Sequence, residues 1–87
     1  VYKRQDPYNA WAYRNKGILM LEKNDQTNAE RLLKQSVDMD PFVDKIYFYL
    51  GMAFLNNGNK TQACESFKKS EEREDGLVTA ALMKVCK

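Results

Sequence analysis

The chain has 87 residues, of which 44% are hydrophobic and 30% charged, with four Gly, two Pro, two Cys and no His. This length allows one small domain, and the low Gly and Pro content favours helices over strands. The lack of His excludes Ser-His-Asp and Cys-His nucleophiles, and two Cys are too few for the common zinc sites. No apolar run approaches the roughly 20 residues of a membrane span. We therefore expect no enzymatic activity, no metal or cofactor, and no membrane insertion.

The first five residues, Val1-Tyr2-Lys3-Arg4-Gln5, resemble the translation of a transposase adapter used to prepare sequencing libraries, and the chain begins without Met. We expect residues 1–5 to be an adapter artefact and residues 6–87 to form a single domain, the C-terminal part of a longer chain in a metagenomic fragment. A natural basic start is the alternative. Without Lys3 and Arg4, 12 of the 14 basic residues remain, and they balance the 12 acidic residues. The net charge therefore gives no support for a nucleic-acid partner.

The chain repeats itself at an offset of 34 residues. Matching residues are small, aromatic or turn-forming rather than charged, which is typical of a structural repeat. The identical pairs are Asp6/Asp40, Pro7/Pro41, Tyr13/Tyr47, Gly17/Gly51, Leu21/Leu55, Thr27/Thr61, Ala29/Ala63, Lys34/Lys68 and Ser36/Ser70.

Each repeat unit has the pattern of two helices, because apolar and small residues recur at helical spacing on both sides of a polar break. The units cover about residues 8–41 and 42–75. The first unit breaks at Asn24-Asp25, and Pro41 ends it because proline cannot continue a helix. The second unit ends at Asp75-Gly76, and a fifth helix is expected over about 77–87.

The second helix of each unit is expected to begin with an N-cap residue. Asp25 and Asn59 precede those helices, and Gln62 lies where a capping partner of Asn59 belongs. Within each unit, Gly17 and Gly51 remove a side chain where the two helices approach each other closely.

These spacings resemble the tetratricopeptide repeat (TPR) family, whose signature is Trp-x2-Leu-Gly-x2-Tyr, then Ala-x3-Phe, then Pro. The second unit reads Tyr47-x2-Leu50-Gly51-x2-Phe54, then Ala63-x3-Phe67, with Asp75 in place of Pro. The first unit reads Tyr13-x2-Lys16-Gly17-x2-Met20, then Ala29-x3-Leu33, with Pro41 in place. Lys16 departs from the expected Leu. The resemblance implies an all-α, right-handed superhelical stack of antiparallel helix pairs, made of two TPR units plus a C-terminal helix.

The resemblance also implies that the first helix of each unit lines a concave groove. That groove would be apolar and aromatic, which is typical of a partner surface. Neighbouring helices or missing repeats could cover it instead. Its expected lining is Trp11, Arg14, Asn15, Ile18, Lys45, Phe48, Tyr49 and Met52. Some TPR proteins bind C-terminal carboxylates through Lys, Arg and Asn; Arg14, Asn15 and Lys45 resemble that clamp in part, whereas Ile18 and Tyr49 depart from it.

The two cysteines are expected to lie close together. If the last helix folds back on its predecessor and turns near Asp75-Gly76, Cys64 faces Cys86 within disulfide reach. A disulfide bond and a pair of buried thiols both fit this arrangement. The ending Cys86-Lys87 also resembles the tails of bacterial envelope proteins with such repeats, which favours an oxidising compartment, although the localisation stays open.

From these observations we predict a non-enzymatic scaffold, monomeric or part of a longer array, that binds a protein, peptide or helix in the groove. Two alternatives remain: a regulatory or capping arm of a larger enzyme, and an RNA-binding helical repeat. The 34-residue period and the balanced charge count against RNA.

Overall fold

The structure is a computed structural model that describes residues 7–86, so the expected adapter segment, residues 1–5, lies outside the described part. The described residues form helices and no strand, which confirms the predicted all-α class. In chain order the elements are α1 (Pro7–Glu22), α2 (Gln26–Met39), α3 (Ile46–Asn56), α4 (Lys60–Glu72), α5 (Ala80–Met83) and the 3₁₀ helix η1 (Lys84–Cys86).

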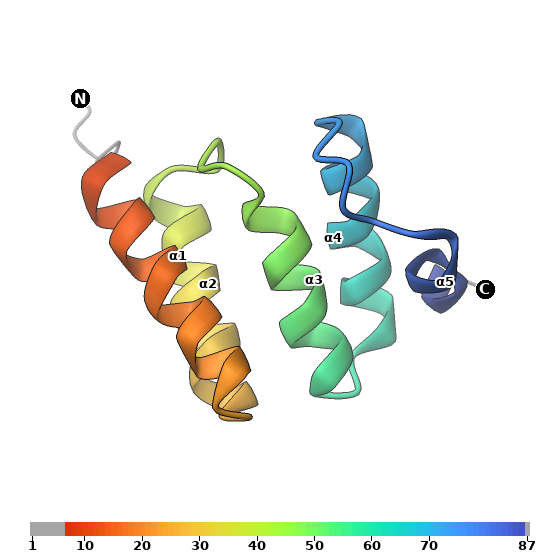
Figure 1. Cartoon of the computed structure of the whole chain (residues 1–87), viewed down its shortest axis with the longest axis horizontal. Helices are drawn as coiled ribbons and strands as arrows, with labels where there is room; N and C mark the ends of the chain where they lie inside the picture. The colour runs from red at the N-terminus through yellow and green to blue at the C-terminus, as the bar shows by residue number, and fades with distance from the viewer. Residues whose placement is uncertain (1–6, 87) are drawn as a thin grey trace.

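The four longer helices form two antiparallel pairs that stand side by side (Figure 1). Helix α1 packs on α2 and α3 packs on α4, while the α2–α3 contact joins the pairs. The C-terminal segment returns along α4 and places α5 beside it. This pairing is consistent with a helical repeat, and the two pairs, residues 7–39 and 46–72, correspond to the two expected units.

Glycine sets the close approach of the two helices in each pair. A Cβ atom added to Gly17 would lie 2.6 Å from Cγ of Leu33, and one added to Gly51 would lie 2.6 Å from Cε1 of Phe67. Leu33 and Phe67 are fully buried, so neither side chain has room to move aside. The two contacts are themselves 34 residues apart, which confirms the predicted role of both glycines.

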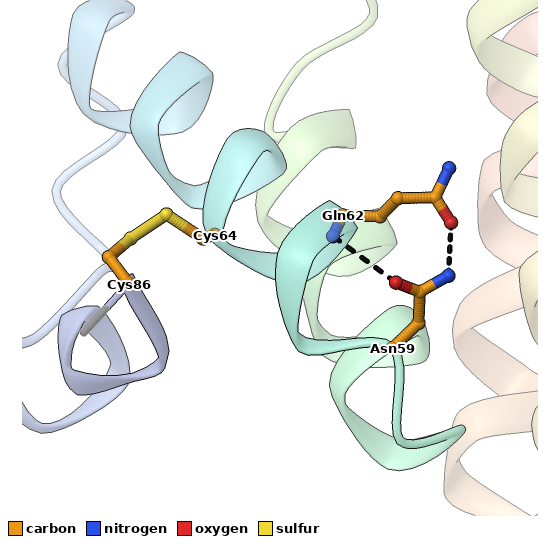
Figure 2. Close-up of a disulfide and its surroundings, with 4 residues drawn as sticks. All are labelled: Asn59, Gln62, Cys64 and Cys86. Carbon is orange, nitrogen blue, oxygen red and sulfur yellow. Dashed lines mark hydrogen bonds between the residues drawn. A yellow bond between two sulfur atoms is a disulfide. The ribbon is translucent and has the colours of Figure 1, made fainter.

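The predicted N-caps are also present. The Asp25 carboxylate accepts a hydrogen bond from the Asn28 backbone N–H, and the Asn59 side chain accepts one from the Gln62 N–H at 3.3 Å. Gln62 does not reach back to the backbone as a capping box would. Its side-chain oxygen instead accepts from the Asn59 amide group (Figure 2). Each cap satisfies an amide that the first helical turn leaves without a partner.

The joint between the two units departs from strict repetition. Helix α1 includes Pro7, whereas α3 begins at Ile46, five residues after the equivalent Pro41. Asp40 ends α2 in an extended conformation, and its carboxylate accepts from the Phe42 N–H at 3.0 Å. This side-chain hydrogen bond favours a turn over a helix at the start of the second unit. Residues 41–45 therefore form a loop that carries the chain from α2 to α3.

The C-terminal helix is shorter than the expected 77–87. Residues 77–79 are not helical, because the Thr79 hydroxyl caps a new start by accepting from the Leu82 N–H at 3.2 Å. Helix α5 then lasts for four residues before η1. Glu74 and Gly76, with φ of 57° and 76°, turn the chain in the left-handed region before this segment begins. The segment is thus an irregular return with two short helical turns.

Candidate functional site

The candidate site is a hollow between α1 and α3, the first helices of the two units. Its volume is about 290 Å³. Helical spacing places its lining on one face of each helix, since Leu21 and Glu22 follow Ile18 by three and four residues, and Met52 follows Tyr49 and Phe48 by three and four. Helix α1 contributes Ile18, Leu21 and Glu22, and α3 contributes Phe48, Tyr49, Met52 and Asn56.

The hollow is apolar at its centre and polar at one end. Ile18, Phe48, Tyr49 and Met52 are half-buried, so part of each side chain remains accessible to a ligand. Glu22 and Asn56 are exposed at the C-terminal ends of their helices. Asn56 also donates to the Gln26 side-chain oxygen at 3.1 Å, which links α3 to the start of α2. This arrangement can bind apolar side chains and offers polar groups at its edge.

Four of the eight predicted groove residues line this hollow, namely Ile18, Phe48, Tyr49 and Met52. Leu21 also lines the hollow and is not among the eight predicted residues. Its separation of three residues from Ile18 was the signal that could have placed it on the hollow's face.

Arg14 lies outside the hollow and serves the joint between the units. It is 8% exposed, and its Nε donates to the Asp44 carbonyl at 2.8 Å. Its guanidinium carbon lies 4.1 Å from the centre of the Trp11 ring and 5.3 Å from that of Tyr49. Because the Arg14 cation contacts two aromatic rings and a backbone carbonyl of the chain itself, it holds the 41–45 loop against α1.

The other three predicted residues surround this arginine or begin α3. Trp11 is 44% exposed and packs one face against Arg14. Asn15 is exposed, and its side-chain oxygen accepts from Arg14 Nη1 at 2.7 Å. Lys45 precedes α3 with a φ of 59°, and its Nζ lies 3.0 Å from an Asp44 carboxylate oxygen. All three side chains therefore have partners within the chain: Arg14 and Asn15 bind each other, and Lys45 pairs with Asp44.

Phe48 has two roles. Its ring centre lies 6.3 Å from that of the buried Phe67 and 5.2 Å from that of Tyr49. It therefore lines the hollow with one part and supports the core of the second unit with another. Met52, which is half-buried in the same hollow, is the better residue for separating binding from folding.

A second feature lies at the opposite end of the molecule, where Cys64 of α4 and Cys86 of η1 form a disulfide bond (Figure 2). Their Cα atoms are 4.9 Å apart. A hollow of about 380 Å³ adjoins this bond. Its lining is Lys60, Thr61, Cys64, Glu65, Lys68, Val85 and Cys86.

Neither feature carries a metal cluster: within residues 7–86, no group of three or more His, Cys, Asp and Glu side chains is arranged to hold an ion. Among the same residues, no helix combines the length and apolar character needed to cross a lipid bilayer. We find no match to the chain among protein-family models, curated proteins or solved structures.

Proposed function

We propose that the chain belongs to a TPR array and binds an apolar segment of a partner protein in the hollow between α1 and α3. In this proposal the helix pairs stack in the right-handed superhelix of that family, and the hollow is part of its concave face. The partner segment is a helix or an extended peptide whose apolar side chains reach Ile18 and Met52.

The apolar hollow between equivalent helices is the observation that carries the proposal. Repeat proteins bind along the surface that corresponding helices share, because each unit adds the same face to it. Here both units contribute accessible apolar side chains to one depression. The volume of about 290 Å³ lies at the lower end of ligand pockets and can hold side chains presented by a peptide.

The lining disfavours the RNA-binding alternative. Of the residues that line the hollow, one is charged, and it is the acidic Glu22. Single-stranded RNA requires cations along its backbone path in addition to stacking aromatics. An acidic edge would repel the phosphates, so a protein segment fits the lining better.

The experiment is selection of binding peptides from a displayed library, followed by affinity measurement on variants. Met52→Glu places a charge in the hollow and should weaken binding at least ten-fold. Leu19→Glu is the matched control, because Leu19 is an exposed apolar residue on α1 that does not line the hollow. Circular dichroism checks that both variants stay helical. Equal weakening by both variants, or no selected peptide, would contradict the proposal.

The disulfide supports an oxidising compartment such as the bacterial envelope, since such bonds persist outside the reducing cytosol. Thiol titration of unfolded protein taken from its native compartment without reductant tests this part of the proposal. Two free thiols would contradict it.

A further inference from the structure

The C-terminal segment 77–86, called the strap below, is held on α4 by few non-covalent contacts. Neither of its short helices contains a fully buried residue. Its hydrogen bonds, such as Leu82 N–H to Thr79 Oγ1 and Met83 N–H to the Thr79 carbonyl, lie within the strap itself. Among residues 7–86, no hydrogen bond or ion pair joins the strap to α4.

Two kinds of contact remain between the strap and the repeat units. Four apolar side chains of the strap are half-buried against the core: Val78, Leu82, Met83 and Val85. The other contact is the disulfide between Cys86 and Cys64, which lies in the first half of α4. Because half-burial of four side chains must offset the ordering of ten residues, the covalent bond is the main restraint.

The disulfide is open to chemical attack from its own hollow. Cys64 and Cys86 both line the depression of about 380 Å³, and both are partly exposed. Lys60 and Lys68 precede and follow Cys64 by four residues, so they lie on the same face of α4 and line the same depression. These two ammonium groups outnumber the one carboxylate of the lining, that of Glu65, so the net positive charge attracts an incoming thiolate and favours the thiolate that leaves.

We propose that Cys64–Cys86 is a redox-sensitive latch whose ligand is a small dithiol reductant that enters through this hollow. One thiolate of the reductant attacks a sulfur of the disulfide, and a mixed disulfide forms while the other cysteine leaves as a thiolate. The second thiol of the reductant then displaces the bound cysteine. The reductant ends as a disulfide, and two electrons and two protons reside on Cys64 and Cys86 as thiols.

Release of the latch changes the end of the molecule and leaves the helix pairs intact. The strap loses its main restraint, so its four apolar side chains become exposed and the outer face of α4 is uncovered. The close approach between Gly51 and Phe67, which packs α3 on α4, does not involve the strap. The inference is therefore independent of what occupies the hollow between α1 and α3.

Hydrogen–deuterium exchange of the full chain, oxidised and then reduced with dithiothreitol, tests the latch. Reduction should speed exchange of amides in 77–86 at least ten-fold, while amides of α1 to α3 change less than two-fold. The double variant Cys64→Ser/Cys86→Ser should exchange like the reduced protein and ignore dithiothreitol. Unchanged exchange in the strap would overturn the proposal, as would loss of protection throughout the chain.

The rate of reduction tests the entry hollow. Lys60→Gln/Lys68→Gln should slow reduction by dithiothreitol at least three-fold, because the attacking thiolate loses two nearby positive charges. Lys23→Gln, a change of the same kind on the exposed turn after α1, should leave the rate unchanged. Equal rates for all three proteins would overturn this hollow as the route of attack.

Discussion

The two helix pairs share their internal contacts and differ at their borders. Gly17 packs against Leu33 in the first pair as Gly51 packs against Phe67 in the second, and a Cβ atom added to either glycine would lie 2.6 Å from its partner side chain. The turns also correspond, since Asn24 and Gly58 both have positive φ. The comparison shows that the 34-residue repeat specifies how each unit packs within itself.

The contacts at the borders of the units, unlike those within them, are not repeated along the chain. Between the pairs, Arg14 donates to the Asp44 carbonyl from one side of the 41–45 loop. Arg73, which ends α4, donates to the Pro41 carbonyl from the other side and lies over the Phe42 ring at 4.7 Å. Two arginines from different units therefore hold the 41–45 loop. Neither is repeated at the 34-residue offset, where Phe48 corresponds to Arg14 and Met39 to Arg73. The second pair further carries the disulfide-linked strap.

The largest expected effect comes from breaking a contact that the two units share. Gly51→Leu must place a whole side chain where the buried Phe67 ring lies, and we expect a loss of at least about 3 kcal/mol. An array of two units has little stability to lose, so the second unit should unfold. The helical circular dichroism signal measures this.

Gly58→Ala is the matched control, because a Cβ at Gly58 meets no atom within 4 Å. Its cost should stay near 1–2 kcal/mol, the strain of a side chain at positive φ. A Gly51→Leu protein that melts no earlier than this control would show that the close approach is not required.

A smaller effect is expected at the joint. Arg14→Met and Arg73→Met should each cost about 1–2 kcal/mol through the lost charge-assisted hydrogen bond and ring contacts. Because both hold one loop, the double variant should cost at least about 0.5 kcal/mol less than the sum. Urea unfolding of the four proteins gives this coupling energy.

Arg31→Met is the control for the joint, since Arg31 makes an exposed hydrogen bond to Asn28 within α2. It should change stability by less than about 0.5 kcal/mol. Strict additivity of the Arg14 and Arg73 effects would mean that the two side chains act separately.

The smallest effect on stability is expected when Gly58 is replaced by Asn, the residue at the equivalent position 24 of the first unit. Gly58 has a φ of 83°, and its counterpart Asn24 has a φ of 63°. Asn tolerates this region better than other residues with a side chain, so Gly58→Asn should lie within about 0.5 kcal/mol of the wild type. Gly58→Val should cost clearly more. Thermal unfolding, which shifts by roughly 4–8 °C per kcal/mol in a domain of this size, separates the two.

Features inside a unit were predictable from sequence because a few residues decide them locally. A glycine beside a helical apolar stripe predicts close packing, and Asp25 or Asn59 after a break predicts a cap. The joint was not predictable, because the bond from Arg14 to the Asp44 carbonyl spans 30 residues and depends on the packed arrangement. The sequence analysis placed Arg14 in the groove because of its position on the first helix, whereas this bond holds it at the joint.

The C-terminal segment shows a different limit. Residues 77–87 contain enough apolar residues for a helix, but the Thr79 side chain caps a new helical start and leaves 77–79 outside the helix. The prediction that Cys64 faces Cys86 assumed a last helix that packs antiparallel on its predecessor and turns near Asp75-Gly76. The structure joins these two residues although the expected helix is reduced to the short α5 and η1, because their proximity depends on where the chain turns.

The central claim is that the hollow between α1 and α3 binds a partner segment, and methyl NMR tests it most directly. A selected peptide is titrated into protein labelled at its Ile, Leu and Met methyl groups. The account predicts the largest shifts, with contacts to the peptide, at Ile18, Leu21 and Met52, and none above noise at Leu19. Shifts confined to Leu19 or to the strap would contradict it.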